Sequence, residues 1–318
     1  MKVLYVLSSP HGGSTLISHM LGLHPSVEHI GELTFINKLL ALDELCTCES
    51  PVGQCNIWQS IFKEFEAITG LPLGSKHPYG AYFGDAIKPK MGTGKVDHGY
   101  QTLGRRISAK LRGAYDTAVL LGSSGGLTKS LTLSRTNEGI SNTFALYQAA
   151  ARVHNVEWIV DASKAPRKAP LLYLKRPEQV RILHLTRDAR SVCASRQRYM
   201  PVRNAAERWN HYHRLSLQLM RKHVPAEHRL SLRYEDLIAE PKTQLEKICA
   251  LMGTDYHPDM LDLSRETHSH AAGGNVARFA FSGGLRQTDD AWRDKLNQND
   301  LAILEKQAGK LNVEFGYT

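Results

Sequence analysis

The chain has 318 residues, of which 42% are hydrophobic and 22% are charged, and this balance excludes a disordered or fibrous protein. Its 40 Lys and Arg outnumber its 31 Asp and Glu, and the surplus of nine positive charges favours an anionic partner. Because no lysine-rich tract or basic helix face is present, the charge predicts a compact pocket for an anionic ligand and no nucleic acid as partner.

The first element expected is a short strand at residues 2–8, KVLYVLS. Its apolar core is too short for a signal peptide, and no apolar run in the chain reaches the ~20 residues that a membrane helix needs. We therefore expect a cytoplasmic protein without a membrane span.

Short apolar runs alternate with longer helical patterns along the chain, which predicts an α/β fold. We expect three layers, α/β/α, around a central parallel sheet of about five strands. The strands are expected at residues 2–8, 26–30, 157–163, 179–187 and 229–234.

We expect one domain over residues 1–318. Residues 71–135 are rich in Gly, Lys and aromatic residues and poor in periodicity. They are predicted to form an irregular, lid-like insertion that covers the site.

The stretch SSPHGGSTL follows the first strand and opens the next helix. When it is aligned with the nucleotide-binding pattern GxxxxGK[ST], Thr15 takes the hydroxyl position, Gly13 the second glycine and Ser14 the place of the lysine. The helix start would still attract an anion through its N–H groups. With no lysine, and no obvious strand-end acid to hold magnesium, the loop predicts phosphate binding without triphosphate hydrolysis. A purely structural turn is the alternative.

Three of the five cysteines, Cys46, Cys48 and Cys55, lie in CTCESPVGQC. They fit reduced structural cysteines, a Cys48–Cys55 disulfide or a metal site, although no fourth ligand stands at zinc-finger spacing. None of these alternatives makes the cluster catalytic.

A second anion motif is TRDARSVCASRQRY at residues 186–199. Arg187 leaves a strand and Ser195 follows eight residues later on the expected helix, so the two side chains form a suitable clamp for a second phosphate. The alternative is an arginine that holds the helix through Asp188.

Taken together, these motifs resemble those of sulfotransferases that use 3′-phosphoadenosine 5′-phosphosulfate (PAPS). SSPHGGSTL, followed by LGLHP, is similar to their 5′-phosphosulfate loop, and Arg187 with Ser195 is similar to their 3′-phosphate motif. VDASKAPR, LRYEDLIAEP, HSHAAGGNVARF and DDAWRDKL follow in the family's order. The resemblance covers residues 3–317 except the insertion. It is closer to the bacterial and the carbohydrate or protein-tyrosine types than to the cytosolic phenol type.

The resemblance implies where the donor binds. The 3′-phosphate would contact Arg187 and Ser195, the adenine would contact Tyr234, and Arg278 corresponds to a late basic residue near the phosphates. The 5′-phosphosulfate would be cradled by His11, Gly12, Gly13, Ser14 and Thr15.

Three residues are the catalytic candidates. Glu32 follows the end of the strand at residues 26–30, which we expect next to the phosphate loop, and it matches the glutamate base of the protein-tyrosine type. A carboxylate that only stabilises a helix start is the alternative. Lys164 corresponds to a lysine that approaches the sulfate. His11 stands where the family usually has Lys or Arg, so we expect it to share that role with Lys164 or to slow the enzyme.

The implied reaction moves a sulfuryl group from PAPS to an acceptor hydroxyl and releases 3′-phosphoadenosine 5′-phosphate (PAP). The acceptor would be a small molecule, carbohydrate, lipid or peptide, and no metal is expected. The sequence leaves two other functions open. One is a P-loop kinase or phosphotransferase using ATP and magnesium, and the other is a non-catalytic nucleotide-binding protein.

Overall fold

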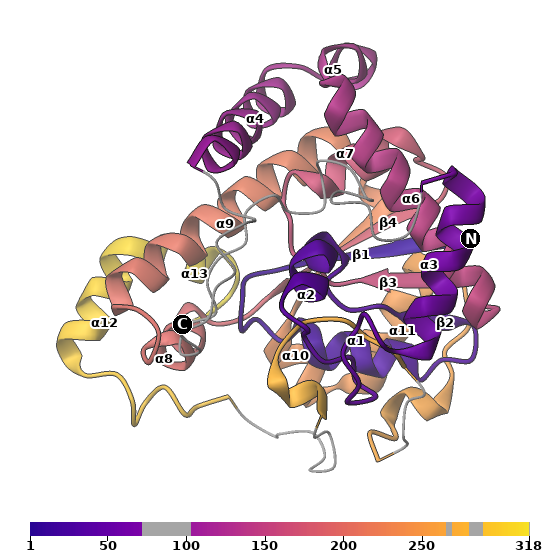
Figure 1. Cartoon of the computed structure of the whole chain (residues 1–318). Helices are drawn as coiled ribbons and strands as arrows, with labels where there is room; N and C mark the ends of the chain where they lie inside the picture. Colours follow the sequence, from indigo (N-terminus) through magenta and orange to yellow (C-terminus); the bar gives the residue numbers. More distant parts are fainter. Residues whose placement is uncertain (72–102, 265–268, 280–288, 318) are drawn as a thin grey trace.

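The structure is a computed structural model that describes residues 1–71, 103–264, 269–279 and 289–317. Its centre is a five-stranded parallel sheet in the order β2-β3-β1-β4-β5 (Figure 1). Every strand lies within a range expected from the sequence, so the α/β prediction is confirmed. The strands are β1 Lys2–Ser8, β2 Val27–His29, β3 Trp158–Asp161, β4 Val180–Thr186 and β5 Arg229–Arg233.

The strand order differs from expectation in one respect. β1 pairs with β3, where Tyr5 faces Asp161, and with β4, where Ser8 faces Leu185. β2 pairs with β3 and not with β1. The expectation that the strand before Glu32 lies directly beside the phosphate loop is therefore wrong, because β3 separates them.

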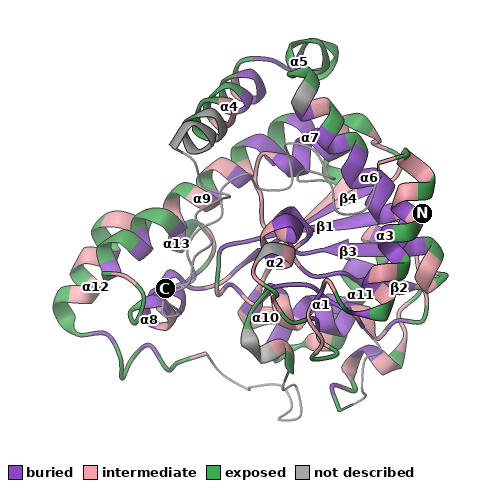
Figure 2. Cartoon of the chain, in the orientation of Figure 1, coloured by how far each residue is buried: buried purple, intermediate pink, exposed green. Residues whose placement is uncertain are grey.

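Side chains of the sheet alternate between two cores, as parallel strands buried on both faces require. Val3, Tyr5 and Leu7 of β1 belong to one core, and Leu4 and Val6 belong to the other. The three-layer prediction is thus confirmed (Figure 2). The first core includes α3 Asn56–Thr69, α6 Ser134–His154 and α7 Lys168–Lys175, and the second includes α1 Ser14–Gly22, α10 Tyr234–Ala239 and α11 Pro241–Met252.

A third core lies where the C-terminal part of the chain packs on Trp209. It includes residues of α8 Ala189–Arg196, α9 Val202–His223, α12 Gln298–Leu304 and α13 Lys310–Glu314. The remaining short elements are α2 Ile36–Ala41, single 3-10 turns at Leu33–Phe35, Ala226–His228, Pro258–Leu261 and Val276–Phe279, and a π-helical turn at Glu305–Gly309. No helix in the described part of the chain is long and apolar enough to cross a membrane.

The prediction that residues 71–135 are irregular is wrong for their second half. Residues Leu103–Gly122 form α4 and Gly125–Leu131 form α5. Ile107, Leu111 and Tyr115 recur at four-residue spacing, a helical period that the Gly- and Lys-rich composition obscured. Residues 72–102 lie outside the described residues. The lid role of this region and the single domain over residues 1–318 stay predictions.

Several histidines are buried where protonation is unfavourable. His184 of β4 and His213 of α9 are completely buried, with Nε2 and Nδ1 2.9 Å apart. Burial lowers the pKa of His184 to about 4 and lowers that of His213 further below its usual value. On the other face of the sheet, burial lowers the pKa of His19 to about 4 and that of His29 to about 3.

These shifts predict that acid destabilises the fold. The unfolded chain, with ordinary histidine pKa values near 6.5, binds more protons below that pH than the folded chain does. Stability is therefore fully present above about pH 6.5 and is lost as the pH falls toward 4. Each such histidine contributes up to about 1.4 kcal/mol per pH unit to the free energy of unfolding in that range. Buried Glu28, whose pKa is raised to about 8, changes the free energy of unfolding in the opposite direction, but the buried histidines outnumber it.

Urea unfolding between pH 7 and 5 measures this loss. The slope of the unfolding free energy against pH should be smaller in His184→Asn and unchanged in a variant of the exposed His211, such as His211→Asn. An unfolding free energy of the parent that stays constant from pH 7 to 5 would contradict the prediction.

Candidate functional site

Candidate residues follow the carboxyl ends of all five strands at one edge of the sheet. In sheet order, Glu32 follows β2, Lys164 follows β3, the loop at residues 11–15 follows β1, Arg187 follows β4 and Tyr234 follows β5. Neighbouring strands lie about 4.8 Å apart, so the three steps from β2 to β4 span about 14 Å. The fold therefore arranges the candidates as a row, with Glu32 near one end and Arg187 toward the other.

The loop after β1 has a backbone that only certain residues adopt. His11 and Gly13 lie in the left-handed region, with φ of 68° and 92°. A Cβ at Gly13 would lie 2.2 Å from Cδ2 of Tyr234, and a Cβ at Gly12 would lie 2.2 Å from Oγ of Ser8. Both glycines are thus required by close packing, and the loop is held directly against Tyr234.

The helix start after this loop is open to an anion. Among the described residues no side chain caps the N-terminus of α1, and its first turn contains no acidic residue. The hydroxyls of Ser14 and Thr15 lie on this first turn. Nearby, Ser9 Oγ and Ser18 Oγ are buried without a partner in the part of the chain that is described. Free N–H groups and the positive end of the helix dipole together favour a phosphate or sulfate here.

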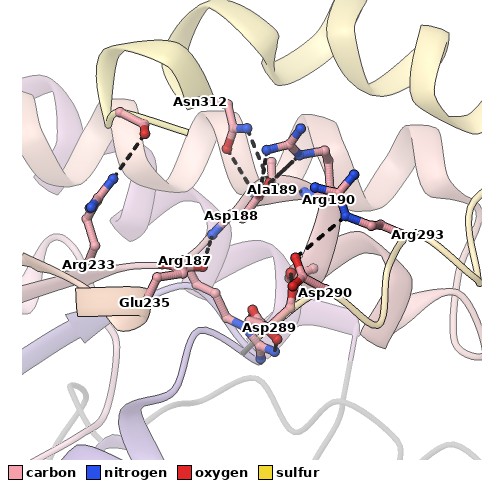
Figure 3. A network of polar contacts seen from close by, with 12 residues as sticks. Arg187, Asp188, Ala189, Arg190, Arg233, Glu235, Asp289, Asp290, Arg293 and Asn312 are labelled. Atoms are coloured by element: carbon pink, nitrogen blue, oxygen red, sulfur yellow. Dashed lines mark hydrogen bonds and ion pairs between the residues drawn. The ribbon is translucent and has the colours of Figure 1, made fainter. Parts of the chain in front are cut away.

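At the start of α8, by contrast, three successive backbone N–H groups donate to side chains (Figure 3). Asp188 accepts from the backbone N–H of Arg190, while Glu235 accepts from that of Asp188 at 3.0 Å. Asn312 accepts from the N–H of Ala189 at 2.9 Å. The start of α1 is therefore a better place for an anion than the start of α8.

The second anion motif meets the loop at His11. The Nη1 of Arg187 donates to the backbone oxygen of His11 at 2.8 Å, and Ser195 Oγ lies 2.9 Å from His11 Nδ1. The guanidinium carbon of Arg187 lies 4.7 Å from the ring centroid of Tyr234. The structure thus brings together His11, Arg187, Ser195 and Tyr234, which are far apart in the sequence.

Arg187 also forms a two-pronged ion pair with Asp289 (Figure 3). Its Nε donates to Oδ2 at 2.6 Å and its Nη2 donates to Oδ1. With the bond to His11, three of the five guanidinium N–H groups are used by described residues, which leaves two for a ligand. Asp289 was not among the predicted site residues, although it lies in the C-terminal DDAWRDKL motif.

His11 is not a positive charge in this site. Burial and the positive charges of Arg196, Arg198, Arg187 and Lys164 lower its pKa to about 4. At neutral pH its imidazole is therefore uncharged and acts only as a hydrogen-bonding group.

Glu32 and Lys164 form an ion pair at the β2 end of the row, between Oε1 and Nζ. Their side chains are 17% and 13% exposed, so the pair is largely shielded from water. The backbone of Lys164 is left-handed, with φ of 58°, an unfavourable conformation that is often found at functional sites. Opposite charges are thus held together beside the loop.

A small pocket surrounds this ion pair. A Cβ at Gly274 would lie 3.8 Å from Thr15 Oγ1 and 3.9 Å from Glu32 Oε1, so the helix start and the carboxylate face the same space. The pocket is lined by Thr15, Ser18, His29, Gly31, Glu32, Ala162, Lys164, Ala271, Gly273, Gly274 and Arg278.

A buried polar network holds the two turns that bear Glu32 and Lys164. Asp161 accepts from the N–H and the hydroxyl of Ser163 and, at 2.5 Å, from the hydroxyl of Tyr147. Ser163 Oγ in turn accepts from the N–H of Thr34 at 2.8 Å. These residues were not among the predicted site residues, although Asp-Ala-Ser after a strand is a typical side-chain-to-backbone turn.

Arg278 lies at the Glu32 end of the row. It donates to the backbone oxygens of Leu45 and Gly274, at 3.1 and 3.0 Å. It shares the pocket with Thr15 of the loop, whereas Arg187 lies across β1. Its contact with a phosphate stays a prediction.

Replacing Gly13 tests the packing of the loop. Gly13→Ala should lower the free energy of unfolding by about 2–4 kcal/mol, since it combines a clash with Tyr234 and an unfavourable backbone. Urea unfolding gives this difference. The control is Gly126→Ala in α5, where the new Cβ meets nothing within 4 Å, and it should be neutral or slightly stabilising. Equal effects of the two changes would contradict the packing account.

Comparisons with known proteins agree with this architecture. Residues 131–258, which include Lys164, Arg187, Ser195 and Tyr234, match the model of the "Sulfotransferase family". Among proteins with curated descriptions, none matches this chain.

Solved structures add the fold. The sulfotransferase domain of the olefin synthase of Synechococcus PCC 7002 matches with a TM-score of 0.56 and 19% identity, over 99% of this chain and 94% of that one. The sulfotransferase domain from the curacin biosynthetic pathway matches with a TM-score of 0.49 and 17% identity, over 96% of both chains. The family match over residues 131–258 and the fold shared with a solved sulfotransferase domain both agree with the resemblance seen in the sequence.

Proposed function

We propose that this protein transfers the sulfuryl group of PAPS to a hydroxyl of a small molecule, carbohydrate, lipid or peptide. The observation that carries the proposal is the order of the row at the sheet edge, from Glu32 and Lys164 through the loop to Arg187 and Tyr234. PAPS carries a phosphosulfate on its 5′ side and a phosphate on its 3′ side. The row has one anion site at its centre, at the start of α1, and a second one beside it, at Arg187 and Ser195.

The donor would lie with its 5′-phosphosulfate at the start of α1. There Gly12, Gly13, Ser14 and Thr15 would supply N–H and hydroxyl donors. The 3′-phosphate would bind the two remaining N–H groups of Arg187 and the hydroxyl of Ser195. The ring of Tyr234, packed on Gly13, would contact the adenine.

The transfer needs a base on the acceptor side and positive charge on the leaving side. Glu32 would take the proton of the acceptor hydroxyl as the hydroxyl oxygen bonds to sulfur. The bond from sulfur to the bridging oxygen breaks, and the electron pair stays on the 5′-phosphate of PAP. Lys164 would stabilise this developing charge, and neutral His11 would add a hydrogen bond. When the sulfate enters beside Lys164, the ammonium can turn from Glu32 to the donor, which leaves the carboxylate for the acceptor.

Calorimetric titration with PAP, ADP and ATP with magnesium tests the donor. PAP should bind at micromolar concentration, and ADP should bind roughly 10–100-fold more weakly because it lacks a charged contact of about 1.5–3 kcal/mol. Arg187→Gln should remove most of the preference for PAP over ADP. The matched control is Arg152→Gln on the exposed surface of α6, which should bind as the parent does. Tightest binding of ATP with magnesium would favour a phosphotransferase instead.

Replacing Glu32 tests the base. Glu32→Gln should lower the rate of PAP release from PAPS, with a panel of hydroxyl acceptors, by roughly 10²–10⁴-fold. Its affinity for PAP should change only a few-fold. The control, Glu64→Gln on the surface of α3, should keep the parent rate. An unchanged rate in Glu32→Gln would exclude Glu32 as the base, and a parent that binds PAP without any turnover would indicate a non-catalytic binding protein.

A further inference from the structure

Three cysteines and one histidine meet next to the candidate site. Cys46, Cys48 and Cys55 come from one loop, and His270 comes from a segment more than 200 residues later. The three Sγ atoms and a ring nitrogen of His270 all lie within 4.8 Å of one another. The fourth ligand that zinc-finger spacing did not predict in the sequence is thus supplied by the fold.

The distances fit a tetrahedral metal ion. With zinc–sulfur bonds of about 2.3 Å and zinc–nitrogen bonds of about 2.0 Å, tetrahedral ligands lie about 3.8 Å apart for two sulfurs and about 3.5 Å apart for sulfur and nitrogen. The Sγ atoms of Cys48 and Cys55 lie 3.6 Å apart. Nδ1 of His270 lies 3.2 Å from Cys55 Sγ and 3.7 Å from Cys46 Sγ.

The backbone already holds these ligands in place. Leu45 and Pro51 form an isolated β-bridge, and the N–H of Cys46 donates to Ser50 at 2.8 Å, which closes the loop that carries Cys48. On the other segment, the backbone oxygen of His270 accepts from the indole N–H of Trp58 at 2.7 Å. Such support is typical of metal sites, whose ligands are fixed by neighbouring hydrogen bonds.

The structure does not contain the alternative disulfide. Cys48 and Cys55 are both free, and their sulfurs are well beyond the roughly 2.05 Å of a disulfide bond. Cys46 and Cys55 are buried and Cys48 is exposed, so one side of the cluster remains accessible to an ion from solvent.

We propose that Cys46, Cys48, Cys55 and His270 bind one structural zinc ion. Three thiolates and one imidazole form a closed set of four ligands, the composition of structural zinc sites, with no position left for a substrate. Binding would release the thiol protons to solvent. The inference does not rest on the proposed reaction, and the ion takes no part in it.

The ion would fix one wall of the pocket that contains Glu32. Cys46 and Gly31 both form β-bridges with Ala272, and the N–H of Glu32 donates to the oxygen of Ala272 at 2.8 Å. The oxygen of Leu45 accepts from Arg278. The zinc site would thus tie the 45–55 loop and the 269–274 segment to Glu32 and Arg278, whereas Arg187 lies beyond β3 and β1.

Metal analysis of the full chain, without a polyhistidine tag and purified without chelators, tests the site. We expect close to one zinc per chain in the parent and a several-fold lower content in Cys48→Ser, in which an exposed side chain is changed. The control Cys249→Ala, a buried cysteine of α11 outside the cluster, should keep its zinc. A zinc-free parent, or a zinc content unaffected by Cys48→Ser, overturns the proposal.

Cobalt gives a second measurement that needs no activity. After zinc is exchanged for Co²⁺, the parent should show thiolate-to-cobalt absorption and visible bands of a tetrahedral site, and Cys48→Ser should lose them. Circular dichroism checks that the variant is folded. Parent protein without these bands would also overturn the proposal.

Titration with PAP separates this inference from the proposed function. Zinc-depleted protein should bind PAP within a few-fold of the parent, because the PAP contacts proposed above involve none of the zinc ligands. A zinc-containing parent that fails to bind PAP contradicts only the proposed function. A parent that is purified free of zinc and still binds PAP contradicts only the zinc proposal.

Discussion

The buried carboxylate of Asp161 is the contact on which the geometry of the candidate site depends. It accepts three hydrogen bonds, two from Ser163 and one from Tyr147, at the point where β3 ends. A buried charge without partners would cost several kcal/mol, so the turn after β3 is fixed by the need to satisfy it. Ser163 passes this constraint to Thr34 and thereby to the turn that carries Glu32. The left-handed backbone of Lys164 is tolerated because residues on both sides of it are held.

The order of the strands determines the order of the candidate residues along the edge of the sheet. β3 lies between β1 and β2, so Lys164 stands between the anion loop and Glu32. In-line transfer needs the acceptor oxygen, the sulfur and the leaving oxygen to be aligned, and in the proposed reaction the base lies on the acceptor side and the positive charge on the leaving side. If Glu32 followed a strand directly beside β1, as the sequence suggested, the carboxylate would approach the donor anions without a cation between them. The observed order avoids this repulsion.

The sequence was sufficient for features set by local pattern. Apolar runs located all five strands, and Gly12 and Gly13 located the turn before α1, because such signals depend on neighbouring residues. It was insufficient where partners come from distant segments. Asp289 on Arg187 and His270 beside the cysteines lie about 100 and 200 residues from their partners, and no spacing rule reaches so far. The helix α4 was also missed. Its apolar residues recur at a helical spacing of four, but the glycines and lysines around them indicated an irregular segment.

Both candidate cations of the row are held by carboxylates before any ligand binds. Lys164 pairs with Glu32 and Arg187 pairs with Asp289, and all four side chains are largely shielded from water. Cations in such surroundings are stable only when they are paired, so the carboxylates occupy the directions from which a donor's anions would approach. In the proposed reaction, donor binding would be an exchange of partners, in which the sulfate replaces Glu32 at Lys164 and the 3′-phosphate shares Arg187 with Asp289. This exchange would release the carboxylate of Glu32 only when the donor is present, so the proposed base would become available only when the sulfuryl group has arrived.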